Sequence, residues 1–461
     1  MKKTFLFGGR AAYLLCIAYQ IIFTFFAAVQ SHGFALKKVY TTTEDGTFYH
    51  TELTSILPML LLGGILILSI ELAAFLFDAK SRFAKLLTPI FLLLGTGVVF
   101  QSFVHPQTSL RHLFCICVGL IFCAICFFLS SLTLSRREFR RLLWTVIGFA
   151  FFAVLIALIF RRNHTGGLWG EVAKLVCIYL CAVSFPHIRE ISNRRLFFAA
   201  LLALLVSVLA MKDFGTAAVL AAVLLASMLY VAPLLALACG GIGAVLTAVG
   251  VFALYVFHPT SYLLTRITSC GKVLLDSEAN GNFRTLLLSL IRGGILGTGF
   301  SPADTHYAFY SFASRHDFVF LSLTATCGLG IALLVIACFI SLALECCRYA
   351  SARSNRRVTA INMCGFFLTL QSAVSILGQL NVIPLTGIPI PFLAYGGSSM
   401  VTCLGTLGIA LSARLTAPER GSIEYQADRL FDCLPPLVIP SCIQMYLQKL
   451  QTLFRKKVLG K

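Results

Sequence analysis

Residues 54–77 read TSILPMLLLGGILILSIELAAFLF, and Glu71 is the only charged side chain in this run. A helix needs about 20 apolar residues to cross the hydrocarbon core of a bilayer, so the run is long enough to span a membrane. Similar runs recur along the 461 residues, of which 58% are hydrophobic and 12% charged. A soluble core cannot bury so much apolar surface, whereas a bilayer is a solvent for it. The sequence therefore predicts an all-α polytopic membrane protein.

Twelve stretches of this kind predict transmembrane helices, and charged or Pro/Gly-rich breaks separate them. The stretches cover residues 11–31, 54–77, 86–104, 110–133, 143–160, 171–186, 196–211, 214–231, 233–257, 317–346, 358–382 and 392–414. The connection between the ninth and tenth stretches, residues 258–316, is the longest of all. Long loops in compact proteins usually carry function, so we expect this extracytoplasmic loop to contribute to the site.

The positions of Lys and Arg predict the orientation of the chain. There are 37 basic and 18 acidic residues, which give a net charge of +19. With the N-terminus inside, the inner segments hold 25 of the basic residues and the outer segments 11, as the positive-inside rule requires. Both termini are therefore expected in the cytoplasm, and the charge is assigned to topology and anionic membrane lipids, not to nucleic acid. A cleaved signal peptide over residues 1–31 is the alternative for the first run.

Charged residues inside membrane spans are costly to bury, so each one is a functional candidate. Glu171 and Lys174 stand three apart on one helix face, where they can pair, either as part of a substrate site or as a structural ion pair. Lys212 and Asp213 interrupt two apolar helices, and Gly215 follows them. Exposed backbone N–H groups beside a positive charge suit an anion site, and a tight turn is the alternative. Glu71 is left without an assigned role.

The segment PLTGIPIPF, residues 384–392, holds three prolines and one glycine, so it cannot be helical. The residues YGGSS, 395–399, follow inside an apolar stretch. Irregular backbone at membrane depth is tolerated only where it is buried in protein or lines a wet cavity. We therefore predict a cavity that reaches the outer leaflet. Its candidate substrate-binding residues are Thr386, Gly387, Pro389, Pro391, Tyr395, Gly396, Gly397, Ser398 and Ser399.

Asp317 is the candidate general base, because it stands where the long outer loop meets the start of a helix. A helix-capping role for the same carboxylate is the alternative. His316, its neighbour, is interpreted as an interfacial polar residue.

Four segments in chain order resemble the SEDS family, the FtsW, RodA and SpoVE proteins of bacterial wall synthesis. They are KDFGTA at 212–217, GGILGTG at 293–299, DFVF at 317–320 and PLTGIPIPFLAYGGSS at 384–399. The resemblance covers roughly residues 171–415 and implies a core of ten transmembrane helices. The chain then divides into two additional N-terminal helices, residues 1–85; a SEDS-like core, residues 86–415; and a basic amphipathic cytoplasmic tail, residues 416–461. The tail suits the inner membrane surface, and a partner-binding helix is its alternative.

The resemblance implies a peptidoglycan glycosyltransferase that polymerises lipid II at the outer face of the bacterial cytoplasmic membrane, together with a class B penicillin-binding transpeptidase. It places the catalytic carboxylate on Asp317 and matches the family's E-x-A-K segment to Glu171 and Lys174. The family's outer-loop arginine corresponds to Arg266. Transfer from a lipid pyrophosphate needs a base for the acceptor hydroxyl and cations for the leaving group. Lys174, Lys212 and Arg266 would supply the cations, Mg²⁺ or Mn²⁺ is a candidate cofactor, and no organic cofactor is expected.

Two other functions stay open. A transporter of lipid-linked precursors also builds its site from broken helices. A non-catalytic scaffold for a transpeptidase is the other, because acidic residues of the family pattern are replaced at Phe312-Ala313 and Ala325-Thr326.

Overall fold

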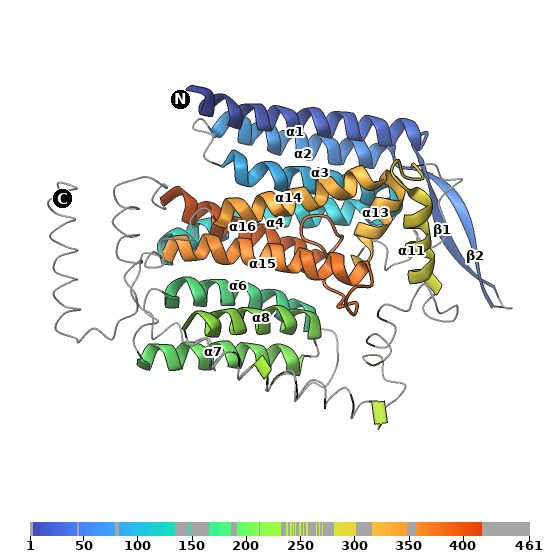
Figure 1. Ribbon diagram of the computed structural model, residues 1–461. Helices are drawn as coiled ribbons and strands as arrows, with labels where there is room; N and C mark the ends of the chain where they lie inside the picture. The colour runs from blue at the N-terminus through green and yellow to red at the C-terminus, as the bar shows by residue number, and fades with distance from the viewer. Residues whose placement is uncertain are drawn as a thin grey trace.

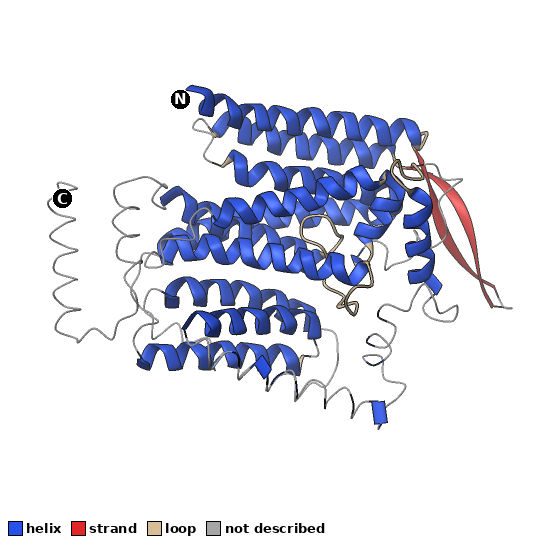
Figure 2. Cartoon of the chain, viewed as in Figure 1, coloured by secondary structure: helices blue, strands red, loops and turns tan. Residues whose placement is uncertain are grey.

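The computed structural model describes residues 3–43, 46–78, 83–133, 166–185, 191–211, 213–231, 281–300, 316–347 and 356–416, with isolated positions at 147–148 and between 237 and 270. Helices dominate the described part (Figure 2). The helices are α1 (Lys3–Gln30), α2 (Leu57–Phe77), α3 (Ala84–Val104), α4 (Pro106–Thr133), α6 (Gly166–Ser184), α7 (Ile191–Ala210), α8 (Phe214–Val231), α11 (Gly281–Gly293), α13 (Val319–Cys327), α14 (Leu329–Cys347), α15 (Arg356–Gln379) and α16 (Gly397–Thr416).

Seven of the described helices are long and apolar enough to cross a membrane: α1, α2, α3, α4, α14, α15 and α16. Helix α8 is apolar over a shorter length. The chain is therefore a mainly helical polytopic membrane protein, as the composition predicts. The count of twelve spans stays a prediction, because the stretches 143–160 and 233–257 lie mostly outside the described residues. The tail 416–461 lies beyond them after Thr416.

The helices form one elongated bundle in which three groups lie side by side (Figure 1). Helices α1, α2 and α3 pack on one another at one edge, and α6, α7 and α8 form the other edge. Helices α4, α14, α15 and α16 fill the middle, where α16 packs along α4 and also touches α15 and α6. Helix α3 is the most buried of the candidate spans, since it contacts the N-terminal pair, α4 and α14.

Between α1 and α2 the chain forms an antiparallel hairpin of β1 (Phe34–Thr43) and β2 (Gly46–Ser55). Phe34 pairs with Ser55 and Thr43 with Gly46. The all-α prediction missed this hairpin, which projects from the end of the bundle that also carries α11 and α13 (Figure 1). The reason is local: both strands contain Phe, Tyr and three Thr, and β1 also contains Val, and these residues favour extended backbone.

Two predicted spans have different boundaries in the structure. The stretch 317–346 is not one helix, because it breaks at Gly328 between α13 and α14. Gly328 has φ of 84°, and a Cβ there would lie 2.2 Å from the Ile295 carbonyl oxygen, so the close approach of residues 295–297 ends the first helix. The last span was predicted to begin at Phe392, but α16 begins at Gly397. Residues 392–396 continue the irregular segment instead.

Candidate active site

Residues 380–396, here called the re-entrant segment, connect α15 to α16 and form the irregular loop drawn among the helices in Figure 2. The apolar side chains of its second half are buried in the bundle, Ile390 and Phe392 among them, whereas Val382 near its start is exposed. Two helices approach this segment closely at glycine positions. A Cβ at Gly97 of α3 would lie 2.9 Å from the Leu393 carbonyl oxygen, and one at Gly215 of α8 would lie 2.6 Å from Ile388 Cγ1. The part of this non-helical segment around residues 388–394 is thus buried in protein, which meets one of the conditions for irregular backbone at membrane depth.

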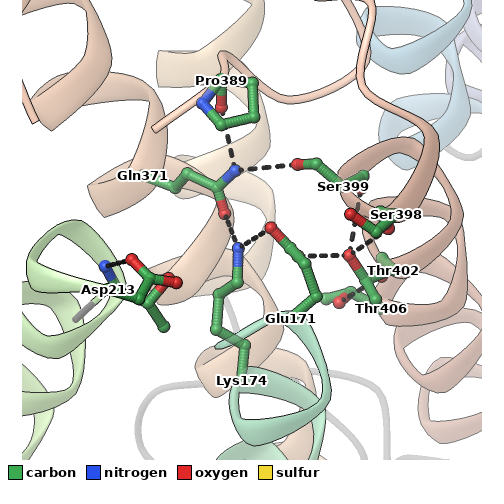
Figure 3. A network of polar contacts seen from close by, with 10 residues as sticks. Glu171, Lys174, Asp213, Gln371, Pro389, Ser398, Ser399, Thr402 and Thr406 are labelled. Carbon is green, nitrogen blue, oxygen red and sulfur yellow. Dashed lines mark hydrogen bonds and ion pairs between the residues drawn. The ribbon is translucent and has the colours of Figure 1, made fainter. Parts of the chain in front are cut away.

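Glu171 and Lys174 form the ion pair that their spacing predicts. Both lie on α6, both are buried, and Lys174 Nζ is 2.7 Å from Glu171 Oε1. Each charge also has a neutral partner on another helix (Figure 3). Lys174 Nζ donates to Gln371 Oε1 at 3.1 Å, and the Thr402 hydroxyl donates to Glu171 Oε2. Buried charges are tolerated only when they are paired and hydrogen-bonded, and this pair satisfies both requirements.

Gln371 extends this network to the re-entrant segment. Its Nε2 donates to the Pro389 carbonyl oxygen at 2.9 Å and lies 3.5 Å from Ser399 Oγ (Figure 3). The Thr402 hydroxyl also lies 3.0 Å from the Ser398 carbonyl oxygen and 3.1 Å from that of Ser399. The structure therefore brings the predicted site residues of α6 together with Pro389, Ser398 and Ser399.

Asp213 lies beside this network without a hydrogen bond to it in Figure 3. Its Oδ1 accepts from the Thr216 backbone N–H at 3.0 Å, as a capping residue does at the start of a helix. Asp213 Oδ2 is also close to α6, since a Cβ at Gly170 would lie 2.2 Å from it. The contacts of Asp213 fit the turn that was the alternative to an anion site. Lys212 and Arg266 lie outside the described residues.

Asp317 is half-buried and stands two residues before the start of α13. Its neighbour His316 packs edge-on against Tyr395 of the re-entrant segment, with 5.0 Å between the ring centroids. The predicted base is therefore next in sequence to a residue that contacts the predicted cavity segment.

A buried glutamine of α15 caps α13. Gln379 Oε1 accepts from the Phe320 and Leu321 backbone N–H groups at 2.9 and 3.2 Å, and its Nε2 donates to Ser375 Oγ at 3.0 Å. These are the N–H groups that a local capping side chain would bind. Helix capping was the alternative role for Asp317. At the Phe320 and Leu321 N–H groups, Gln379 provides the cap instead.

The remaining predicted site residues lie near the site mainly through their backbone atoms. The Thr386 carbonyl oxygen would lie 3.1 Å from a Cβ at Gly215, Gly387 has φ of 72°, and Gly397 opens α16 against Cys115 of α4. Pro391 is buried and Gly396 half-buried.

Sequence reasoning missed the polar residues that join the segments, namely Gln371, Gln379 and Thr402. The two glutamines are eight residues apart with Ser375 between them, so they share one face of α15. That polar stripe in an apolar stretch is the signal that could have found them. Among the described residues, no group of three or more His, Cys, Asp or Glu could hold a metal ion. Mg²⁺ or Mn²⁺ therefore stays a prediction.

A comparison with protein families identifies the group to which this chain belongs. The family model of the cell cycle proteins FtsW, RodA and SpoVE matches residues 98–417. The chain belongs to this family. The match includes every described residue of the candidate site and begins inside α3, so α1, the hairpin and α2 lie outside it. The division of the chain at residues 85 and 415 stays a prediction.

Among curated relatives, a probable peptidoglycan glycosyltransferase FtsW of Alkalilimnicola ehrlichii is 29% identical over 324 residues, which cover 65% of this chain and 78% of that protein. The protein of the same description from Enterococcus hirae is 28% identical over 149 residues, and only 37% of its length is covered. A chain from a solved structure titled "Structural coordination of polymerization and crosslinking by a peptidoglycan synthase complex" shares the fold, with a TM-score of 0.54 at 20% identity. That alignment covers 72% of this chain and 96% of the other.

Proposed function

We propose that this FtsW/RodA/SpoVE family member polymerises lipid II into glycan strands at the outer face of the bacterial cytoplasmic membrane. One observation carries the proposal: a single segment of irregular backbone contacts both the Glu171–Lys174 network and His316, the residue before Asp317. A paired cation and a carboxylate at the start of a helix are the groups that transfer from a lipid pyrophosphate requires. The curated relatives described as probable peptidoglycan glycosyltransferases support the same activity.

In this mechanism Asp317 takes the proton from an acceptor sugar hydroxyl. The hydroxyl oxygen attacks the anomeric carbon of the donor, and the bond between that carbon and the pyrophosphate oxygen breaks. Undecaprenyl pyrophosphate leaves with the bonding electron pair. Displacement without a protein-bound intermediate inverts the anomeric centre, so the protein has to position two sugars and stabilise the leaving charge.

Among the described residues, Lys174 is the candidate cation for stabilising the leaving pyrophosphate. An ammonium group carries three N–H donors, and Glu171 and Gln371 take two of them, which leaves one for a phosphate oxygen. Arg266, Lys212 and a divalent cation are further candidates for the leaving group. The proposal keeps both termini in the cytoplasm and a class B penicillin-binding protein as the transpeptidase partner.

Polymerisation of purified lipid II, resolved as glycan chains on a gel, tests the proposal with wild-type protein and Asp317→Asn. Removal of a general base typically costs 10²–10⁴-fold in rate, so we expect Asp317→Asn to make chains at least about 100-fold more slowly while it still binds lipid II. Wild-type protein that makes no chains with its transpeptidase and a divalent cation present would contradict the proposal. Vectorial lipid II movement by both proteins would then indicate a transporter, and partner binding without either activity a scaffold.

A further inference from the structure

His112 of α4 is a buried polar residue that the mechanism above does not use. Its side chain is 1% exposed, and neither Nδ1 nor Nε2 has a hydrogen-bond partner among the residues that the structure describes. Buried polar groups in proteins are nearly always hydrogen-bonded, because an unmade bond in a dry interior costs free energy. An imidazole with two unpartnered nitrogens therefore needs a ligand or water to complete its contacts.

His112 lies near other residues of the candidate active site. Its ring lies 5.8 Å from the ring of Tyr395, and His316 packs on the same tyrosine at 5.0 Å. Asp317 follows His316 directly. The three rings come from α4, the re-entrant segment and the start of the α13 region, so tertiary packing gathers them beside the proposed base. Tyr395 is half-buried, and Gly397 and Ser398, which follow it at the start of α16, are exposed.

The chemistry of the imidazole selects among the parts of the substrate. A neutral imidazole offers one donor and one acceptor, and a hydroxyl group offers both in return. A phosphate oxygen at neutral pH only accepts, so it would leave the acceptor nitrogen unpaired. The ring of Tyr395 supplies the apolar wall that small-molecule sites place beside a few orienting polar groups.

We infer that His112 binds a sugar hydroxyl of the lipid-linked substrate, beside Tyr395. This inference rests on the proposed glycosyltransferase function. It assigns to α4 a contact to the sugar that is separate from the Glu171–Lys174 network and from the base itself.

The test compares His112→Phe, which keeps a ring against Tyr395 but removes both nitrogens, with Ser130→Ala. Ser130 is the matched control because it is on the same helix, is fully buried, and also has no hydrogen-bond partner among the described residues. If unpartnered polar atoms on α4 matter only for folding, the two variants will behave alike. We expect instead that His112→Phe lowers kcat/KM for lipid II about tenfold, the usual effect of one lost hydrogen bond, while Ser130→Ala keeps wild-type kinetics.

Lipid II analogues that each lack one sugar hydroxyl identify the contact. With the analogue that lacks the hydroxyl bound by His112, the histidine variant and wild type should polymerise at equal rates, because the contact is already gone. Wild-type kinetics of His112→Phe, or the same tenfold loss with every analogue, would overturn the inference.

Binding of fluorescent lipid II by the same purified proteins separates the two proposals. If wild-type protein makes no chains, the glycosyltransferase proposal fails, and weaker binding by His112→Phe than by Ser130→Ala would still support the contact. Equal binding of lipid II by both variants would then contradict the proposed His112 contact as well.

Discussion

Glu171 and Glu71 are both buried carboxylates in apolar helices, yet their surroundings differ. Glu171 on α6 is paired with Lys174 and accepts a hydrogen bond from Thr402 of α16. Glu71 on α2 is more deeply buried, and its Oε2 has no hydrogen-bond partner within the described part of the chain. The first carboxylate is held by two helices of the family-matched region, whereas the second lies on α2, outside that match. Burial of a carboxylate alone therefore does not identify the site, and its partners do.

The largest expected effect comes from removing the charge partner in the built network. Lys174→Met leaves Glu171 as an unpaired buried charge, so we expect a loss of about 3–5 kcal/mol in the free energy of unfolding, measured by chemical denaturation in detergent. The double variant Glu171→Gln with Lys174→Met removes both charges and should recover a large part of this loss. A single variant as stable as wild type would mean that the pair is solvated and that the comparison with Glu71 fails.

A smaller effect is expected from a neutral member of the site. Gln379→Leu leaves the Phe320 and Leu321 N–H groups without their acceptor, so stability should fall by about 1–3 kcal/mol. These N–H groups belong to the first turn of the helix that follows Asp317. The rate of polymerisation should therefore fall even at a temperature where the variant is fully folded. Ser375→Ala is the control, since it removes the other hydrogen bond of Gln379 and leaves the cap. Equal activities of the two variants would show that the cap does not position Asp317.

The smallest effect is expected at Glu71. Glu71→Gln keeps the size of the side chain and breaks no charge pair among the described residues, so the free energy of unfolding should change by less than about 1 kcal/mol. Thermal unfolding of the purified variant measures this. A loss as large as that of Lys174→Met would reveal a partner for Glu71 and make the two carboxylates equivalent.

Much of the fold follows from the sequence because membrane spans are long and their apolar composition is local. The seven candidate spans coincide with predicted stretches, although two predicted boundaries were wrong. The break at Gly328 was missed because it depends on residues 295–297, some thirty positions away, which approach the glycine backbone. The β1–β2 hairpin was missed because a loop between two spans was not read for strand-forming residues.

The candidate site divides in the same way. The Glu171–Lys174 pair follows from a spacing of three on one helix, and the irregular backbone of residues 384–392 follows from its prolines and glycine. The roles of Gln371, Gln379 and His112 could not be predicted, because the role of a polar side chain in an apolar helix depends on the group that it contacts. Each of the two glutamines binds an atom from another element, and His112 lies against Tyr395 from the re-entrant segment.

The amino-acid sequence by itself determined a polytopic membrane protein, the pairing of Glu171 with Lys174 and the position of a non-helical segment, because these depend on composition and on neighbours within one turn of helix. Only the tertiary structure decided that Gln379 caps α13, that Gln371 links the ion pair to Pro389, and that His112 and His316 meet at Tyr395. These contacts join residues from separate helices. The physical reason is that a buried polar group must find its partner in space, and packing of the bundle selects which groups become neighbours.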